Sequence, residues 1–247
     1  MTAAHRILLI TGASRGIGAA TARLAATRGY DVAVNYRRDE AAANDVVKAV
    51  KAFGNEAMAI QGDMAREEDV ARVFAAVDDK LGPLTHFVYN CGITGAEGRL
   101  DEVDPKTIRA VLDLNVFGAL ICLAAAVRRM SVKHGGKGGA IVLLSSAAAT
   151  LGAPNEYVWY AASKGAVDSM TNGLAQEVAG EGIRVNAVAP GAIETEIHSP
   201  GRLQRVTPRI PLGRVGSAEE VAEAIHFLLS DAAAYVTGSV LRVSGAR

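Results

Sequence analysis

The chain of 247 residues contains only two cysteines, few aromatic residues and no excess charge of either sign. Its 26 basic residues are balanced by 26 acidic ones, so it lacks the basic surplus that nucleic acids and anionic membranes attract. Cys91 and Cys122 form neither a disulfide framework nor a CxxC zinc site, and the five histidines show no HExxH spacing. We therefore expect no metal, no nucleic-acid partner and no membrane partner.

Long apolar runs are also missing. The apolar run within the segment MTAAHRILLITG is too short for the hydrophobic region of a signal peptide. No stretch reaches the roughly 18 uninterrupted apolar residues of a membrane span. Hydrophobic residues nevertheless make up 50% of the chain, which is enough for a sizeable core. These features predict a soluble, cytoplasmic protein.

Short aliphatic runs alternate with helical patterns along the whole chain. Strands are expected at 6–11, 31–35, 56–61, 84–89, 140–145, 183–187 and 236–243, with helices to about 28 and at 39–53, 66–81, 105–130, 156–179 and 217–229. Such alternation indicates right-handed βαβ units. We predict an α/β, single-domain Rossmann fold over residues 1–247: a doubly wound parallel sheet of about seven strands, flanked by helices.

A glycine-rich turn, TGASRGIG at 11–18, follows the first strand and opens the first helix. Gly12 permits a tight turn, Gly16 allows the backbone to approach a pyrophosphate, and Gly18 allows the helix to pack closely on the strand. The helix N-terminus then offers free N–H groups to the phosphates. This arrangement predicts a dinucleotide site, the alternative being a turn with packing glycines.

The segment after the second strand bears on the choice of cofactor. A site for NAD has a carboxylate here for the ribose 2′-hydroxyl, whereas a basic residue accepts the 2′-phosphate of NADP. Residues 35–38 (NYRR) contain no acid. Arg15 and Arg37 are expected to clamp that phosphate, and Arg38 either joins them or is a solvated charge at the helix start. NADPH is favoured, with NADH as the alternative.

Tyr160 and Lys164 lie four residues apart in a helical pattern and face the same side of the helix. An ammonium one turn away favours the phenolate, so we expect the pKa of Tyr160 to fall toward neutral pH. On its own, the pair is also compatible with ordinary packing along one helix face.

With these motifs in view, the sequence resembles the short-chain dehydrogenase/reductase family from Ile7 to Val243. The order and spacing of the matching blocks are jointly very specific. They are TGASRGIG at 11–18, Gly62-Asp63-Met64, Asn90-Cys91-Gly92, Asn115, Leu144-Ser145-Ser146, YAASK at 160–164, Arg184-Val185-Asn186, and PGAIET at 190–195.

The resemblance implies an oxidoreductase that moves hydride between a nicotinamide and a carbonyl or secondary alcohol. Tyr160 would be the acid–base group, and Lys164 would hold the nicotinamide ribose and lower the tyrosine pKa. Ser146 would donate a hydrogen bond to the substrate oxygen. Asn115 would distort its helix to hold a water that links Lys164 to solvent. Ser146 lies one residue further from Tyr160 than is usual in the family, so Ser145 stays an alternative.

Nucleotide contacts follow from the same resemblance. Asp63 and Met64 would contact adenine, Asn90 and Gly92 would border the adenine ribose, and Ile193 and Thr195 would hold the carboxamide and pyrophosphate. The expected cofactor-binding residues are Gly12, Ser14, Arg15, Gly16, Ile17, Gly18, Arg37, Arg38, Asp63, Met64, Asn90, Gly92, Tyr160, Lys164, Pro190, Gly191, Ile193 and Thr195. The resemblance, together with two long apolar helices, also points to a homotetramer with two-fold interfaces.

The substrate stays open. Segment 195–213 is expected to be a lid, and its arginines Arg202, Arg205 and Arg209 either meet an anionic substrate or lie in solvent. Four further residues are expected to line the pocket: Ile93, Thr94, Tyr157 and Trp159. Two rival functions are an NADPH-binding sensor or scaffold without turnover, and a methyltransferase, which would need an acid after the second strand.

Overall fold

The structure is a computed structural model and describes residues 5–247. In this part of the chain, one sheet of seven parallel strands has the order β3-β2-β1-β4-β5-β6-β7, which confirms the predicted fold. The strands are β1 (Arg6–Ile10), β2 (Tyr30–Tyr36), β3 (Ala57–Gln61), β4 (His86–Tyr89), β5 (Gly139–Leu144), β6 (Ile183–Pro190) and β7 (Val240–Val243).

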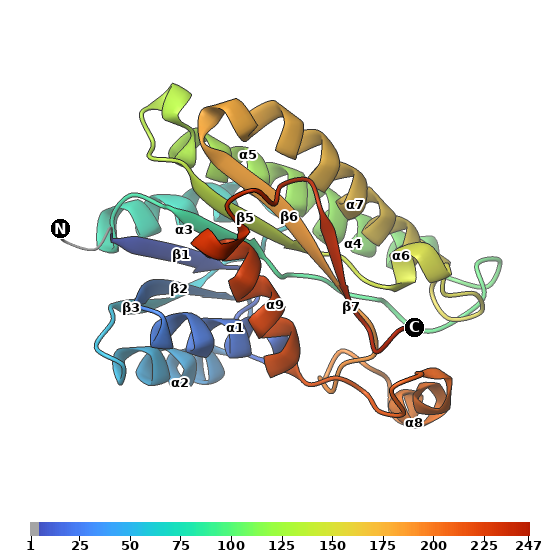
Figure 1. Ribbon diagram of the computed structural model, residues 1–247. Helices are drawn as coiled ribbons and strands as arrows, with labels where there is room; N and C mark the ends of the chain where they lie inside the picture. Colours follow the sequence, from blue (N-terminus) through green and yellow to red (C-terminus); the bar gives the residue numbers. More distant parts are fainter. Residues whose placement is uncertain (1–4) are drawn as a thin grey trace.

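Helices cover both faces of the sheet (Figure 1). One face packs against α1 (Gly16–Thr27), α2 (Glu40–Lys51) and α9 (Ala218–Leu229), and the other against α3 (Glu67–Lys80), α5 (Ala119–Met130) and α7 (Val158–Val178). Strand β1 shows why the apolar run is continuous: Ile7 and Leu9 enter the α3 side of the core, while Leu8 and Ile10 enter the α1 side. Burial on both faces thus explains the strand pattern.

The helix predicted over 105–130 is present, with an irregular segment in its middle. It consists of α4 (Pro105–Leu112), a π-helical segment (Asp113–Gly118) and α5. By length and composition alone, Pro105–Met130 could cross a membrane, but 44% of its most apolar window is buried in this fold. A core helix of a water-soluble protein passes the same test, so this is weak evidence for a membrane span.

Several element boundaries also differ from expectation. The last strand begins only at Val240, because Gly238, at φ 74°, turns the chain and its N–H bonds the carbonyl of Val185. The loop before α7 contains a short helix, α6 (Ala148–Leu151), and the expected lid contains α8 (Arg202–Val206). The predicted capping box of α9 is present between Ser217 and Glu220.

The strand order reverses between β1 and β4, where a doubly wound sheet opens a crevice at the carboxyl ends of its strands. Helices α6 and α8 and the C-terminus lie at this end of the molecule (Figure 1). Residues far apart in the sequence therefore meet here.

Candidate active site

A cleft of about 1400 Å³ lies at the carboxyl ends of the strands. It brings together nearly all of the expected site residues, while Gly18 and Asn115 are not among the residues that line it. The expected residues on its wall are Gly12, Ser14, Arg15, Gly16, Ile17, Arg37, Arg38, Asp63, Met64, Asn90, Gly92, Ser146, Tyr160, Lys164, Pro190, Gly191, Ile193 and Thr195.

The glycine turn has the geometry of an anion cradle. Gly12 and Gly16 have φ values of 62° and 54°, which favour glycine. A Cβ on Gly18 would lie 2.7 Å from both the Asn90 Nδ2 atom and the Gly12 carbonyl oxygen, so only glycine fits. Arg15 precedes α1 without a side-chain cap, and the first turn holds no acid. The N-terminal amides of α1 therefore suit an anionic group such as a pyrophosphate.

Two asparagine side chains, of buried Asn35 and partly buried Asn90, hold this turn in place. The Asn90 side-chain amide donates to the carbonyls of Thr11 (3.0 Å) and Gly12 (2.9 Å). The Asn35 side chain accepts from the Gly12 N–H at 3.1 Å and donates to the carbonyls of Ile60 and Gly62. Sequence reasoning missed this bracing role of Asn35, although a polar residue at the end of an otherwise apolar strand was a signal for it.

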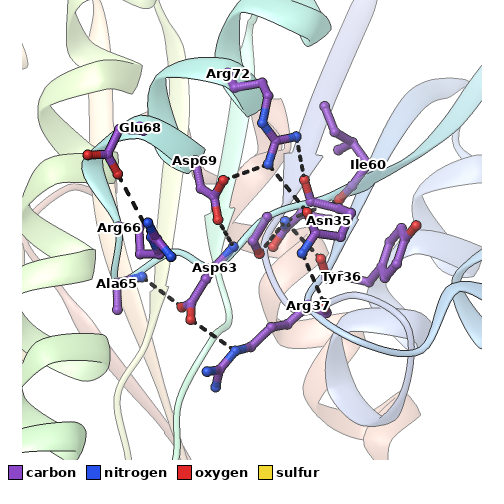
Figure 2. A network of polar contacts seen from close by, with 12 residues as sticks. Asn35, Tyr36, Arg37, Ile60, Asp63, Ala65, Arg66, Glu68, Asp69 and Arg72 are labelled. Atoms are coloured by element: carbon purple, nitrogen blue, oxygen red, sulfur yellow. Dashed lines mark hydrogen bonds and ion pairs between the residues drawn. The ribbon is translucent and has the colours of Figure 1, made fainter.

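The arginines expected to clamp a 2′-phosphate are each paired with an acid. Arg37 Nε lies 2.9 Å from an Asp63 oxygen, and the other Asp63 oxygen accepts from the Ala65 N–H at 3.1 Å (Figure 2). Arg15 pairs with Glu196 at 2.7 Å. To clamp a 2′-phosphate as expected, each arginine must therefore exchange its acid or share itself between the acid and the phosphate. Arg38 is exposed at the rim.

Met64 lines the cleft, where the expected contact with adenine is open to its backbone rather than its side chain. Its side chain is buried in the core, with Sδ 3.8 Å from the Cys122 sulfur. Only the backbone of Met64 is therefore free to border a nucleotide.

Tyr160 and Lys164 project from α7 and are both buried. The Lys164 ammonium donates to the Leu144 carbonyl at 2.6 Å and lies 5.6 Å from the centre of the Tyr160 ring. Burial raises the pKa of Tyr160, and this effect outweighs the lowering by the Ser146 hydroxyl and by Arg202. The expected fall in the Tyr160 pKa is therefore wrong for this state of the site. Burial also lowers the pKa of Lys164 to about 8.

The two candidate serines have different surroundings. The Ser146 hydroxyl lies against the Tyr160 phenol and accepts a hydrogen bond from the Ala148 N–H at 3.1 Å. Ser145 is buried, and its hydroxyl is directed to the Lys164 carbonyl at 3.4 Å. Ser146 is thus better placed than Ser145 to share a substrate oxygen with Tyr160.

Asn115 lies within the π-helical segment and is fully buried. Its side chain exchanges two hydrogen bonds of 3.0 Å with the backbone of Ile93 and donates to the Ser163 hydroxyl at 3.0 Å. A Cβ on Gly92 would lie 3.4 Å from the Lys164 ammonium and 3.5 Å from the Asn115 side-chain oxygen. Asn115 therefore joins the end of β4 to α7 beside the Lys164 ammonium. A π turn often marks a functional position.

Several residues of the expected lid, 195–213, line one side of the cleft. Thr195 packs on the glycine turn, since a Cβ on Gly16 would lie 3.4 Å from its methyl group. Tyr157, Ile93 and Thr94 line the cleft, as expected. Trp159 does not: it is buried, and its indole N–H donates to the Thr94 carbonyl at 2.7 Å.

Comparison with known proteins finds relatives along nearly the whole chain. A family model described as enoyl-(acyl carrier protein) reductase matches residues 12–245. The chain is 49% identical over 245 residues to the uncharacterized oxidoreductase YgfF of Escherichia coli, covering 98% of this chain and 99% of that protein. It is 39% identical over 241 residues to a 3-oxoacyl-[acyl-carrier-protein] reductase of Synechocystis, covering 97% and 96%.

A solved structure is similar over nearly its whole length. A blue fluorescent protein from a metagenomic library, in complex with NADPH, superposes with a TM-score of 0.91 at 33% identity, covering 98% of this chain and 97% of that one. In a fold of this kind, a dinucleotide lies along the crevice at the carboxyl ends of the strands.

Proposed function

Because this chain belongs to the short-chain dehydrogenase/reductase family, and is thus a nicotinamide-dependent oxidoreductase, we propose that it transfers hydride between NADPH and a carbonyl or secondary-alcohol substrate. The proposal depends chiefly on one observation: the Tyr160 phenol, with Ser146 against it and Lys164 one turn away, lines the same cleft as the glycine turn.

The chain's own groups have distinct roles in this proposal. Ser146 and Tyr160 hydrogen-bond the substrate oxygen, and Tyr160 delivers the proton when a ketone is reduced. Its raised pKa keeps the phenol protonated at neutral pH, as an acid requires. Lys164 orients the ribose of the nucleotide, and Asn115 fixes the backbone beside it. A bound nicotinamide supplies the hydride, and the protein aligns it and excludes water.

The choice of NADPH rests on charge at the end of β2. Arg15, Arg37 and Arg38 line this part of the cleft. Asp39, the next acid along the chain, accepts a hydrogen bond from the Ala42 N–H as the cap of α2, which leaves it less free for a ribose hydroxyl. Asp63 is held by Arg37. A 2′-phosphate can take over the Arg37 guanidinium, because phosphate is a strong bidentate acceptor.

A carbonyl panel assayed with NADPH at neutral pH tests the proposal. Short ketones, cyclic ketones, a sugar and a keto acyl thioester cover the substrate types that the family resemblance leaves open. Oxidation of NADPH with at least one carbonyl is the expected result. Binding of NADPH without turnover on the whole panel favours the rival function, a sensor or scaffold.

Two exposed apolar patches support assembly as a homotetramer, and the cytoplasmic location is proposed from the sequence alone. Leu112, Phe117 and Leu120 form one patch on the α4–α5 region. Val240 and Leu241 lie exposed on β7, which is an edge strand of the sheet. Covering an unpaired edge and an apolar helix face by two-fold contacts gives four subunits. We treat residues 1–247 as one domain, with a lid at about 195–213.

A further inference from the structure

Arg202 differs from the other arginines of the lid. Its side chain is only 13% exposed and lines both the main cleft and a smaller adjoining cavity. The Arg205 side chain, on the same short helix, is 54% exposed and pairs with Glu97 at 3.0 Å. Arg209 is exposed at the cleft rim. Arg202 is therefore held at the site, whereas its neighbours face solvent.

The contacts of Arg202 leave part of its guanidinium free. Nε and Nη2 donate to one oxygen of Glu156 at 3.3 and 2.9 Å, and Nη1 contacts the His198 Nδ1 atom at 3.0 Å. Nε also forms a longer ion pair with Glu97, at 4.0 Å. Burial lowers the pKa of His198, so this imidazole accepts a hydrogen bond without adding charge. These contacts use three of the five N–H groups of an arginine, and two are left for a ligand.

The Tyr157 ring lies between Arg202 and Tyr160, whose phenol is the proposed acid–base group. Its guanidinium carbon lies 5.2 Å from the centre of the Tyr157 ring, which in turn meets the Tyr160 ring edge-on at 5.5 Å. The three groups line one continuous cleft. A ligand anion bound at Arg202 would therefore be separated from the Tyr160 phenol by about the width of the Tyr157 ring.

The charged residues on the side of the cleft formed by the lid and the C-terminus favour the binding of an anion. The guanidinium groups of Arg202, Arg209 and Arg247 line this side, against the carboxylates of Glu156 and Glu196. Glu196 is already paired with Arg15. Arg202 is offset by Glu156 and Glu97, whereas within residues 5–247 no ion pair engages Arg209 or Arg247. The positive surplus of this side of the cleft therefore comes from Arg209 and Arg247.

We propose that the substrate carries a carboxylate, which Arg202 binds while Tyr160 acts on a ketone or secondary alcohol separated from it by a short chain or one ring. The inference rests on the proposed NADPH-dependent activity. Glu156 and His198 orient the guanidinium along the Tyr157 ring, so the two free N–H groups are prearranged for a planar carboxylate. Arg202 would thus determine specificity, while the proton transfer itself stays with Tyr160.

The test compares each acid with its own ester. NADPH oxidation is measured with 4-oxopentanoate, 5-oxohexanoate and 4-oxocyclohexanecarboxylate, and with the methyl ester of each. Wild-type protein should show a KM at least about tenfold lower for the acids, the scale of one charge-assisted hydrogen bond. Arg202→Leu should raise the KM for the acids about tenfold or more and leave the KM for the esters unchanged.

Two further variants separate recognition from a structural role. Arg214→Leu is the control, since Arg214 is exposed, pairs with Glu220 and does not line the cleft, so it should leave both substrate sets unchanged. Arg202→Lys keeps the charge but loses the planar fork, so it should raise the KM for the acids by less than Arg202→Leu does. If Arg202→Leu does not fold, the lysine variant makes the same comparison. Equal KM values for acids and esters in wild type, or equal losses for both in the variants, overturn the inference.

Failure of the proposed function would be recognisable separately. If no carbonyl is reduced, calorimetric titration of 4-oxocyclohexanecarboxylate into the protein with NADP⁺ still tests Arg202. Binding that the Arg202→Leu variant loses, and that the methyl ester does not show, supports the carboxylate site. Absence of binding to wild type overturns it. Reduction of neutral ketones alone leaves the proposed function intact and rejects this inference.

Discussion

The Lys164 ammonium is hydrogen-bonded to the carbonyl oxygen of Leu144, the last residue of β5, at 2.6 Å. This contact anchors α7 to the sheet end and directs the positive charge toward the floor of the cleft. The Tyr160 ring lies one helical turn away, with its centre 5.6 Å from the ammonium nitrogen. The two side chains share a site without a direct hydrogen bond between them in this structure.

Tyr160→Phe keeps the ring and removes the proton donor. We expect kcat to fall by at least about 10²-fold, the usual scale of an acid–base contribution, while NADPH binding is kept. Steady-state kinetics and a fluorescence titration of NADPH check both parts. Turnover at the wild-type rate would show that another group supplies the proton.

The buried ammonium of Lys164 should make stability depend on pH. Below pH 8 the folded protein must hold this charge in a poorly solvated place; above the lowered pKa of about 8 the folded lysine is neutral, while the unfolded chain stays protonated until about 10.5. The unfolded state then binds more protons, so stability rises with pH in this window. The free energy of unfolding of wild type, relative to Lys164→Met, should therefore increase between pH 8 and 10.5. A flat or falling difference in denaturant titrations would contradict this.

Arg37→Asp should change the cofactor preference. The new carboxylate would repel a 2′-phosphate and accept a hydrogen bond from a ribose hydroxyl, so kcat/KM should fall for NADPH and be kept or improved for NADH. Arg66→Ala is the control, since Arg66 pairs with Glu68 and does not line the cleft. A wild-type protein that prefers NADH would refute the assignment.

Each of the two apolar patches should belong to a different subunit interface of the tetramer. Leu120→Asp and Leu241→Asp each place a charge in one patch, so each variant should give dimers where wild type gives tetramers. The double variant should give monomers, because both patches are then disrupted. Light scattering at micromolar concentration measures this. A wild-type mass of 25.6 kDa, that of one chain, would reject assembly.

Ion pairs of the lid should make its motion sensitive to salt. Glu196, Arg202 and Arg205 tie it to Arg15, Glu156 and Glu97, and several of these groups are exposed. Amides of residues 196–210 should exchange faster in the protein alone than with NADPH and a substrate analogue, and faster still at high salt, which screens exposed pairs. Equal protection in all states would instead indicate a rigid lid.

Much of the fold could be predicted from sequence because its signals are local. The continuous apolar strands, the glycine turn and the Ser217 capping box each depend on neighbouring residues. Features set by tertiary contacts were missed. The pairing of Arg37 with Asp63 joins the ends of β2 and β3, and the orientation of Trp159 depends on the Thr94 carbonyl. The pKa of Tyr160 could not be predicted from its spacing to Lys164, since burial raises it and the groups that lower it are Ser146 and Arg202.

The π-helical segment also sets the helical phase of everything after it. A π turn holds one residue more than a turn of regular α-helix. If 113–118 became regular with no residue removed, the next helix would rotate by about 100°. Cys122, Ala126 and Met130, all buried, would then leave the core. The irregular turn that presents Asn115 is thus matched to the hydrophobic pattern of Ala119–Met130.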